Sequence, residues 1–300
     1  MDSRLTFASF NINLTKRQEG CEFEYLQIRF CELLYIISFK SRITQRFYNI
    51  YHLGLVSKHM PFLIFLIALL YASVGHGGGS GYLALMGLFN TDPAIMKPTA
   101  LGLNILVTSI GTYKYARAGH FRWKLFLPFA ITSIPFAFLG GRLNLDGAIY
   151  KSIVGIILFY AAIRIFFNTE LPKEKTYFNP PIWTALLSGA LIGFLSGITG
   201  VGGAIFLGPL ILLMGWATIK ETAGVSTAFV LVNSISGFLG HWSTTLHFPP
   251  QIIYWGIAVL IGGWIGAEYG SQKLTNPLIK KLLAIVLFLG SIKMLFSALG

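Results

Sequence analysis

The sequence predicts an all-α protein that crosses a membrane several times and consists of two halves related as an inverted repeat. Of its 300 residues, 54% are hydrophobic and only 11% are charged, whereas about a quarter of the residues of a soluble domain are charged. Apolar runs of roughly 17 to 21 residues recur, and a helix of that length crosses ~30 Å of hydrocarbon. Two apolar stretches are interrupted by almost the same run of glycines, which indicates an internal repeat.

Residues 1–59 differ from the rest of the chain. They mix charged and aromatic residues and contain no uninterrupted apolar span, and no signal-peptide cleavage site follows their short apolar stretch. Met60 opens directly onto an apolar run, so we expect the working protein to begin near Met60. The part upstream is then a poorly ordered extension or a misassigned start. Residues 60–179 and 180–300 are expected to form the two membrane repeats of one domain, which the motifs described next predict to be a transporter.

Each repeat opens with an interrupted apolar segment. The first, residues 61–89, contains Ser-Val-Gly-His-Gly-Gly-Gly-Ser-Gly at 73–81, and the second, residues 182–214, contains Ser-Gly-Ile-Thr-Gly-Val-Gly-Gly at 196–203. Glycine runs unwind a helix, and unwound backbone at membrane depth is tolerated only where it is buried in protein or lines a wet cavity. Matching interruptions in two halves of a membrane protein indicate a transporter binding site.

Three plain spans follow each interrupted segment. Residues 97–100 (Lys-Pro-Thr-Ala) correspond to residues 220–223 (Lys-Glu-Thr-Ala), at the same spacing as the glycine runs. Chance similarity between leucine-rich helices is the alternative, but the shared glycine run and the Lys-x-Thr-Ala step disfavour it. The expected spans are residues 98–114, 124–141 and 148–167 in the first half, and 222–240, 250–269 and 277–298 in the second.

Loop charges predict how the interrupted segments lie in the membrane, because cytoplasmic loops carry an excess of lysine and arginine. If each segment enters and returns as a re-entrant hairpin, one side collects 11 basic residues and the other five. If each crosses once, the division is nine against seven. The hairpin arrangement is therefore predicted. It leaves three crossings per half, inverts the second repeat relative to the first, and places both chain ends outside the cytoplasm if the chain starts near Met60.

Several of these motifs resemble the sulfite exporter TauE/SafE family. The run Gly-Ile-Thr-Gly-Val-Gly-Gly at 197–203, followed by Pro-Leu-Ile-Leu at 209–212, is similar to the signature of that family. Residues 222–237 are similar to its next helix and residues 119–123 to a loop between spans. The resemblance covers residues 60–300 and implies export of a small sulfur-containing anion, such as sulfite or an organosulfonate, through the inner membrane. The first half departs from the pattern at Met86 and at His76.

The two interruptions suit an anion. A hairpin that returns through the membrane presents free backbone N–H groups at a helix start, where the helix dipole contributes about half a positive charge. Glycine allows close approach and the positive φ angles of an anion nest. Tight helix packing through small residues is the alternative interpretation. The expected cradle consists of Gly77, Gly78, Gly79, Ser80, Gly200, Gly202 and Gly203.

Polar residues around the cradle are expected to complete the binding site. His76, whose counterpart in the second half is Thr199, could donate to the anion or carry a coupled proton, or could be a neutral histidine bonded to backbone. Residues on the spans that follow each hairpin could contact the solute or only bond helix to helix. They are Thr99, Asn104, Thr108 and Ser109 in the first half, and Thr222, Ser226, Thr227, Asn233 and Ser234 in the second.

Other classes of function are disfavoured. The net charge of +12 is explained by loop lysines and arginines rather than by nucleic-acid binding. The histidines are scattered over different loops, so we predict no enzyme, no metal site and no cofactor. The acidic residues of the membrane part lie near helix ends, which disfavours a cation site. A channel, or a permease for another small solute or ion, remains the alternative, and a homo-oligomer is compatible with the sequence.

Overall fold

The structure is a computed structural model that describes residues 59–89, 91–143, 147–167, 179–242 and 248–272, with residues 288, 291–292, 295–296 and 298. These residues belong to one compact unit that starts at Val56. The expectations for the leading segment and for most of the span at 277–298 concern residues outside this set.

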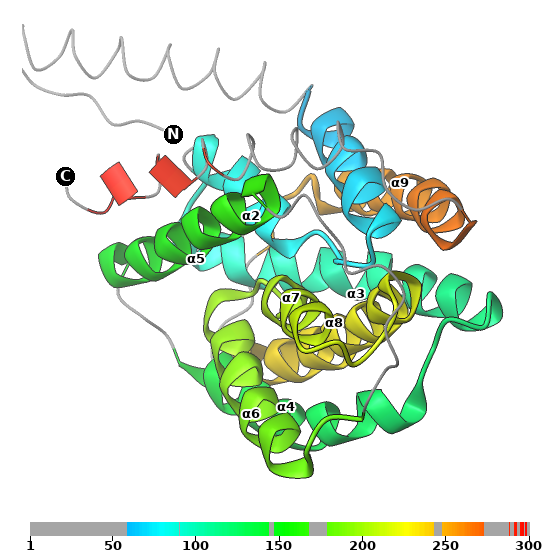
Figure 1. Cartoon of the computed structure of the whole chain (residues 1–300). Coiled ribbons are helices and arrows are strands. Elements are labelled where there is room, and N and C mark those ends of the chain that lie inside the picture. Colours follow the sequence, from blue (N-terminus) through cyan, green and yellow to red (C-terminus); the bar gives the residue numbers. More distant parts are fainter. Residues whose placement is uncertain are drawn as a thin grey trace, which may run out of the picture. The chain divides into compact units, whose positions relative to one another are not determined.

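All regular structure among the described residues is helical, which confirms the all-α prediction (Figure 1). Five helices are long and apolar enough to cross a membrane: α3, α4, α6, α8 and α9. The protein is therefore a multi-pass membrane protein in architecture. In chain order, the helices are 59–73, α2 (Gly79–Leu88), α3 (Pro93–Arg117), α4 (Trp123–Arg142), α5 (Gly147–Phe167), α6 (Ile182–Thr199), α7 (Ala204–Leu213), α8 (Ile219–Trp242) and α9 (Ile252–Gln272).

The first plain span of each half starts at a capped helix end. The carboxylate of Asp92 accepts a hydrogen bond from the Ala94 N–H (2.9 Å) at the start of α3. At the start of α8, the Thr218 hydroxyl accepts from the Glu221 N–H (3.2 Å), and the Glu221 carboxylate accepts from the Thr218 N–H (2.9 Å). This reciprocal pair is a capping box. It fixes where α8 enters the bundle.

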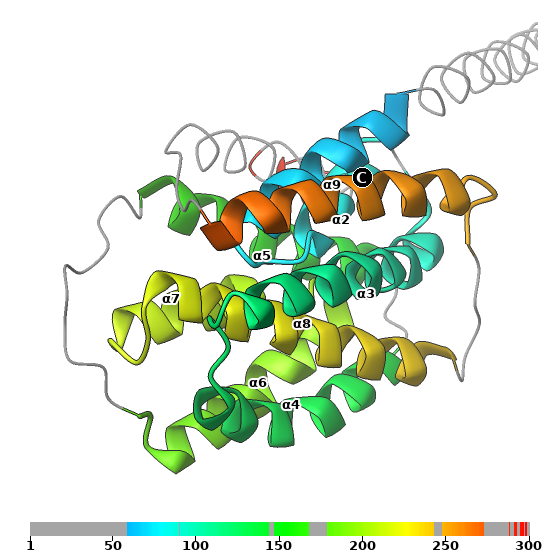
Figure 2. The same cartoon turned by 90° about the vertical axis from the view of Figure 1, so that its right-hand side faces the viewer.

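A stripe of glycines on α6 lets that helix lie directly on α4. A Cβ added to Gly189, Gly193 or Gly197 would collide with backbone of α4, at residues 129, 133 and 137 respectively. The contacts advance in the same direction on both helices, so α4 and α6 are parallel. Figures 1 and 2 show the two side by side. Small residues at such positions allow backbones to approach within direct contact.

A second stripe, on α9, makes the equivalent contact with the helix at 59–73. Gly262, Gly266 and Gly270 lie against backbone carbonyls of residues 65, 69 and 73. This pair is also parallel, and it lies on the other side of the central helices α3 and α8 (Figure 2). In both pairs, the first helix of one half's interrupted segment packs on the second plain span of the other half.

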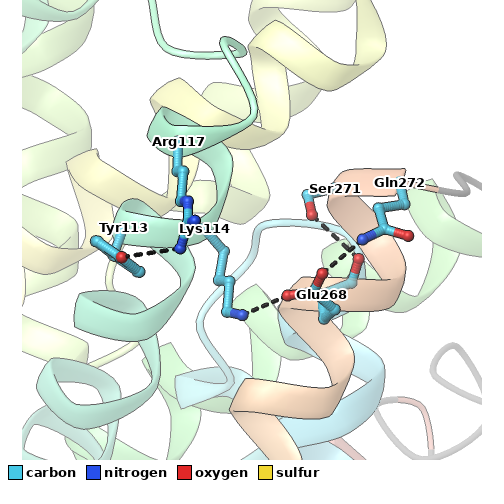
Figure 3. Close-up of polar contacts among 6 residues, drawn as sticks. All are labelled: Tyr113, Lys114, Arg117, Glu268, Ser271 and Gln272. Atoms are coloured by element: carbon cyan, nitrogen blue, oxygen red, sulfur yellow. Dashed lines mark hydrogen bonds and ion pairs between the residues drawn. The ribbon is translucent and has the colours of Figure 1, made fainter.

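Charged residues gather where α3 ends and α8 begins. Lys114 of α3 forms an ion pair with Glu268 of α9 (Figure 3). Its ammonium also lies 3.8 Å from the centroid of the Trp264 ring. The side-chain amide of Gln272 donates to the other Glu268 oxygen (2.5 Å). Arg122 lies 3.7 Å from the carboxylate of Glu221. Both acidic residues thus have basic partners; Asp146 lies outside the described residues.

The count of loop charges placed Lys97 in a loop before the first plain span, among the five basic residues of one side, and the structure corrects this. Lys97 lies in the second turn of α3 rather than in a loop, and only 5% of its surface is exposed. The helix starts at Pro93, five residues before the expected span, because Asp92 caps it and proline is well suited to a first helical turn.

Candidate functional site

Both predicted interruptions are breaks in the helical backbone. In the first break, residues 74–78 separate the helix at 59–73 from α2, and in the second, residues 200–203 separate α6 from α7. Each break contains three glycines with positive φ, a conformation that side-chain-bearing residues adopt only under strain. They are Gly75, Gly77 and Gly78 in the first break and Gly200, Gly202 and Gly203 in the second.

The two breaks meet. Gly79, the first residue of α2, lies against the second break so closely that an added Cβ would be 2.8 Å from the Val201 carbonyl oxygen and 2.9 Å from that of Gly200. The sequence predicted a matched pair of breaks, and the structure brings them into contact although more than 100 residues separate them along the chain.

Asn104 lies at the meeting point, near the middle of the 25-residue helix α3. Its side-chain amide is fully buried and donates long hydrogen bonds to the carbonyls of Gly200 (3.4 Å) and Val201 (3.5 Å). Its Oδ1 atom faces the first break, 3.2 Å from the position of a Cβ on Gly77. One side chain therefore contacts both breaks.

Val230 of α8 also packs against both breaks where they meet. A Cβ on Gly77 would lie 2.9 Å from its Cγ1 atom, and a Cβ on Gly202 would lie 2.5 Å from it. Val230 is near the middle of the 24-residue helix α8 and is completely buried. The breaks are thus held between the midpoints of the two central helices.

His76, in the first break, points toward the second half. Its Nδ1 atom bonds to the Val74 carbonyl (2.9 Å), and because a carbonyl only accepts, this nitrogen is the donor. The ring lies beside α7: a Cβ on Gly208 would be 3.4 Å from both Cε1 and Nε2 and 3.7 Å from the Ser226 hydroxyl. His76, Gly208 and Ser226 are therefore neighbours.

The helices that start after the breaks and the helices that end before them differ in how their terminal backbone groups are hydrogen-bonded. Helices α2 and α7 have Gly78 and Gly203 at their N-cap positions, so no side chain caps their first N–H groups. The carbonyls that end the preceding helices are satisfied: Tyr115 donates to Ser73 (3.0 Å) and Tyr150 donates to Thr199 (3.0 Å). Uncapped N–H groups and the positive ends of two helix dipoles therefore face the breaks.

Many predicted polar residues are buried with atoms that have no hydrogen-bond partner among the described residues. Such atoms are rare, because an unpaired buried polar group costs about 1–3 kcal/mol. Asn233 is the extreme case, since both atoms of its amide lack a partner at 0% exposure. The predicted residues in this class are Thr99, Asn104 (Oδ1), Thr222, Ser226, Asn233 and Ser234.

Other predicted residues bond locally. The hydroxyls of Thr108, Thr199 and Ser80 donate to the carbonyls of Asn104 (2.6 Å) and Leu195 (2.7 Å) and to the Tyr71 hydroxyl (3.0 Å). Thr227 is buried against Gly111. Ser109 is exposed and donates to the Ile105 carbonyl (2.7 Å), so it is not among the residues that converge on the breaks.

Two polar residues in or beside the glycine runs were not among the predicted site residues. Tyr82 is fully buried, its hydroxyl has no partner among the described residues, and its ring covers Gly78. Ser196 is buried near the end of α6, and its hydroxyl also has no hydrogen-bond partner among the described residues. Both lie in or beside the glycine runs, which is the signal that could have found them. The described residues contain no group of three or more His, Cys, Asp or Glu side chains placed to hold a metal.

Comparison with known proteins agrees with the motifs. The family model described as sulfite exporter TauE/SafE matches residues 60–294. The chain belongs to this family. The match spans both breaks and all five membrane-length helices.

Curated relatives are also membrane proteins by name. The chain is 39% identical to the probable membrane transporter protein y4hK of Sinorhizobium fredii over 236 residues, which cover 77% of this chain and 95% of the relative. It is 27% identical to the probable membrane transporter protein YdhB of Bacillus subtilis, over 76% of this chain and 94% of the relative. No solved structure matches the chain. The protein is thus a probable membrane transporter of the TauE/SafE family.

Proposed function

We propose that the protein is a secondary transporter that exports a small sulfur-containing anion, such as sulfite or an organosulfonate, across the inner membrane. The observation that carries the proposal is the contact of the two breaks at Asn104, midway along a membrane-length helix, with an uncapped helix start following each break. The description of the family names sulfite, which supports the choice of substrate class.

The second interrupted segment is a re-entrant hairpin in this proposal. Arg122 supports it, because the guanidinium donates both to the Asn179 side chain just before α6 (3.3 Å) and to the Trp216 carbonyl just after α7 (2.9 Å). One residue can contact both only if the segment returns to the end from which it started. Buried packing of α7 against α8 accompanies that return.

The first segment returns in the opposite sense. Gly81 of α2 packs against Ile67 and Tyr71, which supports α2 running back along the helix at 59–73. That helix is parallel to α9 and ends near Tyr115, at the far end of α3 from Lys97. The second break lies against Lys97. The two hairpins therefore approach the middle from opposite ends, as an inverted repeat requires.

The proposed site binds the anion mainly through main-chain donors. The N–H groups that open α2 and α7 supply partial positive charge, and Asn104, Ser226 and His76 flank them with polar side chains. The described carboxylates of the membrane part, Asp92, Glu221 and Glu268, lie at helix ends and would not repel an anion there. Rocking of the halves around the breaks gives alternating access.

Transport in proteoliposomes tests the proposal. Purified protein is reconstituted, and uptake of radiolabelled sulfite is measured with methanesulfonate, thiosulfate and sulfate as competitors and as internal counter-substrates. We expect saturable uptake that an internal anion accelerates. Uptake that is linear in concentration and shows no counter-transport would identify a channel instead, and uptake of neutral or cationic solutes alone would exclude an anion carrier.

A matched pair of glycine variants ties transport to the breaks. Gly79→Leu fills the point where the breaks meet, and we expect uptake to fall to the level of empty liposomes. Gly102→Ala on α3 is the control, because the nearest atom to its added Cβ lies 3.9 Å away. If Gly79→Leu is folded and transports like the wild type, the anion does not pass between the breaks.

A further inference from the structure

Lys97 is a buried cation beside the second break. Its ammonium donates to the carbonyls of Gly141 (2.9 Å), Leu143 (3.0 Å) and Gly140 (3.4 Å). These carbonyls end α4, where the last turn of a helix has no internal donors for its oxygens and the dipole is negative. These three contacts hold the ammonium in place.

The second break lies in contact with this lysine. A Cβ on Gly200 would be 3.3 Å from the Lys97 carbonyl oxygen and 3.5 Å from the Cγ atom of its stem. Gly140, one of the acceptors, packs against the last turn of α6, where an added Cβ would lie 3.0 Å from the Ile198 nitrogen. Lys97, the end of α4 and the end of α6 therefore form one junction at the break.

No carboxylate among the described residues pairs with Lys97. The described ion pairs, Lys114–Glu268 and Arg122–Glu221, lie at the other end of α3 and at the start of α8. A buried ammonium whose hydrogen bonds to described residues go to backbone carbonyls, and not to a carboxylate, keeps a net positive field in its surroundings. Charge interactions weaken slowly with distance where water is excluded, so this field reaches the neighbouring break.

We propose that Lys97 sets the charge selectivity of the site, by placing a fixed positive charge beside the second break that favours anions and favours dianions over monoanions. This proposal rests on the proposed function, because it assumes that the solute lies between the breaks. Lys97 acts here as a selectivity residue at a distance. It makes no direct contact with the solute in this proposal.

Lys220 offers a matched control. It corresponds to Lys97 in the repeat, and its ammonium likewise donates to a carbonyl that ends the next plain span, that of Gln272 in α9 (3.2 Å). The Lys220 contact is exposed to solvent. Water and salt screen a charge in such a position. Removing it changes the net charge of the protein equally but leaves the field at the break unchanged.

The test compares Lys97→Gln, Lys97→Arg and Lys220→Gln with the wild type in lipid nanodiscs. Affinities for methanesulfonate, a monoanion, and thiosulfate, a dianion, are measured by calorimetry, and unfolding midpoints are measured without ligand. We expect Lys97→Gln to weaken methanesulfonate binding on the order of tenfold and thiosulfate binding by about the square of that factor. Lys97→Arg and Lys220→Gln should bind both anions within about threefold of the wild type.

The outcomes separate the two proposals. If the wild type binds no anion, the proposed function is wrong. If it binds both, and Lys97→Gln weakens them equally or not at all, the selectivity role is overturned while the proposed function stands. A lowered unfolding midpoint with equal losses identifies Lys97 as a structural cap of α4. If Lys97→Gln does not fold, Lys97→Met, which keeps the apolar packing of the stem, is measured in the same way.

Discussion

At the first break the chain leaves the helix after Ser73 and resumes at Gly79, whereas at the second it leaves after Thr199 and resumes at Ala204. The backbones are alike, with three positive-φ glycines and an uncapped helix start in each. The side chains differ. The first break carries the imidazole of His76, whereas its counterpart Thr199 ends helix α6 just before the second break and bonds its hydroxyl to the Leu195 carbonyl.

The surroundings of the breaks differ in the same way. Gly75 lies against the backbone of Ala223 in the first turns of α8, and Gly200 lies against Lys97 in the first turns of α3. Each break thus contacts the first plain span of the other half, but among the described residues only the second break has a buried ammonium beside it. We infer that the shared backbone binds the solute and that the unshared side chains make the two ends of the pathway chemically different.

The largest expected effect is the loss of folding when a glycine is replaced in one of the two stripes, on α6 and α9, that support the breaks. Gly197→Leu on α6 and Gly270→Leu on α9 should both prevent folding, because even a Cβ at either position collides with backbone of the neighbouring helix. Overpacking of this kind costs about 3 kcal/mol or more when backbone cannot move aside. The yield of monodisperse protein and the unfolding midpoint measure the effect, with Gly102→Ala as control. A variant of one stripe that is as stable as the wild type would show that the two supports are not equivalent.

Within the breaks, the expected effect is smaller on stability than on transport. Gly202→Ala adds a methyl group where φ is 91°, next to Val230. The backbone strain costs about 1–3 kcal/mol, so the protein should fold while sulfite uptake falls to background. Val230→Ala in the same chain removes the steric part and should restore some stability. If the double variant is no more stable than Gly202→Ala, the contact with Val230 is not the cause.

Two buried asparagines, one on α3 and one on α8, sharpen the comparison further. Asn104 donates to the second break, whereas the amide of Asn233 has no partner among the described residues. Replacing an unpaired buried amide by leucine removes a penalty of about 1–3 kcal/mol, so Asn233→Leu should raise the unfolding midpoint and lower uptake. Asn104→Leu should lower both. An Asn233→Leu variant that is destabilised would mean that this amide is satisfied by a group such as bound water.

Much of this architecture was predictable because it depends on local chemistry. The glycine runs located both breaks, since only glycine adopts the positive φ angles there without strain, and apolar length located the spans of the described part to within a few residues. The start of α3 was placed five residues late although Asp92-Pro93 is a recognisable helix start. The re-entrant hairpins and the inverted repeat remain proposals, supported by contacts such as those of Arg122.

The contacts between distant segments were not predictable in the same way. Lys97 was counted as a loop lysine, because nothing in its neighbours along the chain indicates that the end of α4 will supply three carbonyls to it. Likewise, Asn104 and Ser109 were predicted alike as residues that could contact the solute. Which polar residues of a helix face the breaks depends on the rotation of α3, and that rotation is fixed by packing against α8 and α9.

The smallest expected effects on stability and uptake are those of substitutions at Thr108 and Ser109, which are neighbours on α3. Ser109 is exposed, and Ser109→Ala should leave both stability and uptake within the error of measurement, since surface substitutions usually change stability by less than about 0.5 kcal/mol. Thr108 is buried, with its methyl group 3.1 Å from the position of a Cβ on Gly77. Thr108→Val keeps that shape and loses only the bond to the Asn104 carbonyl, so we expect a modest drop in uptake through a less fixed Asn104. An effect of Ser109→Ala as large as that of Thr108→Val would mean that α3 presents a different face to the breaks during transport.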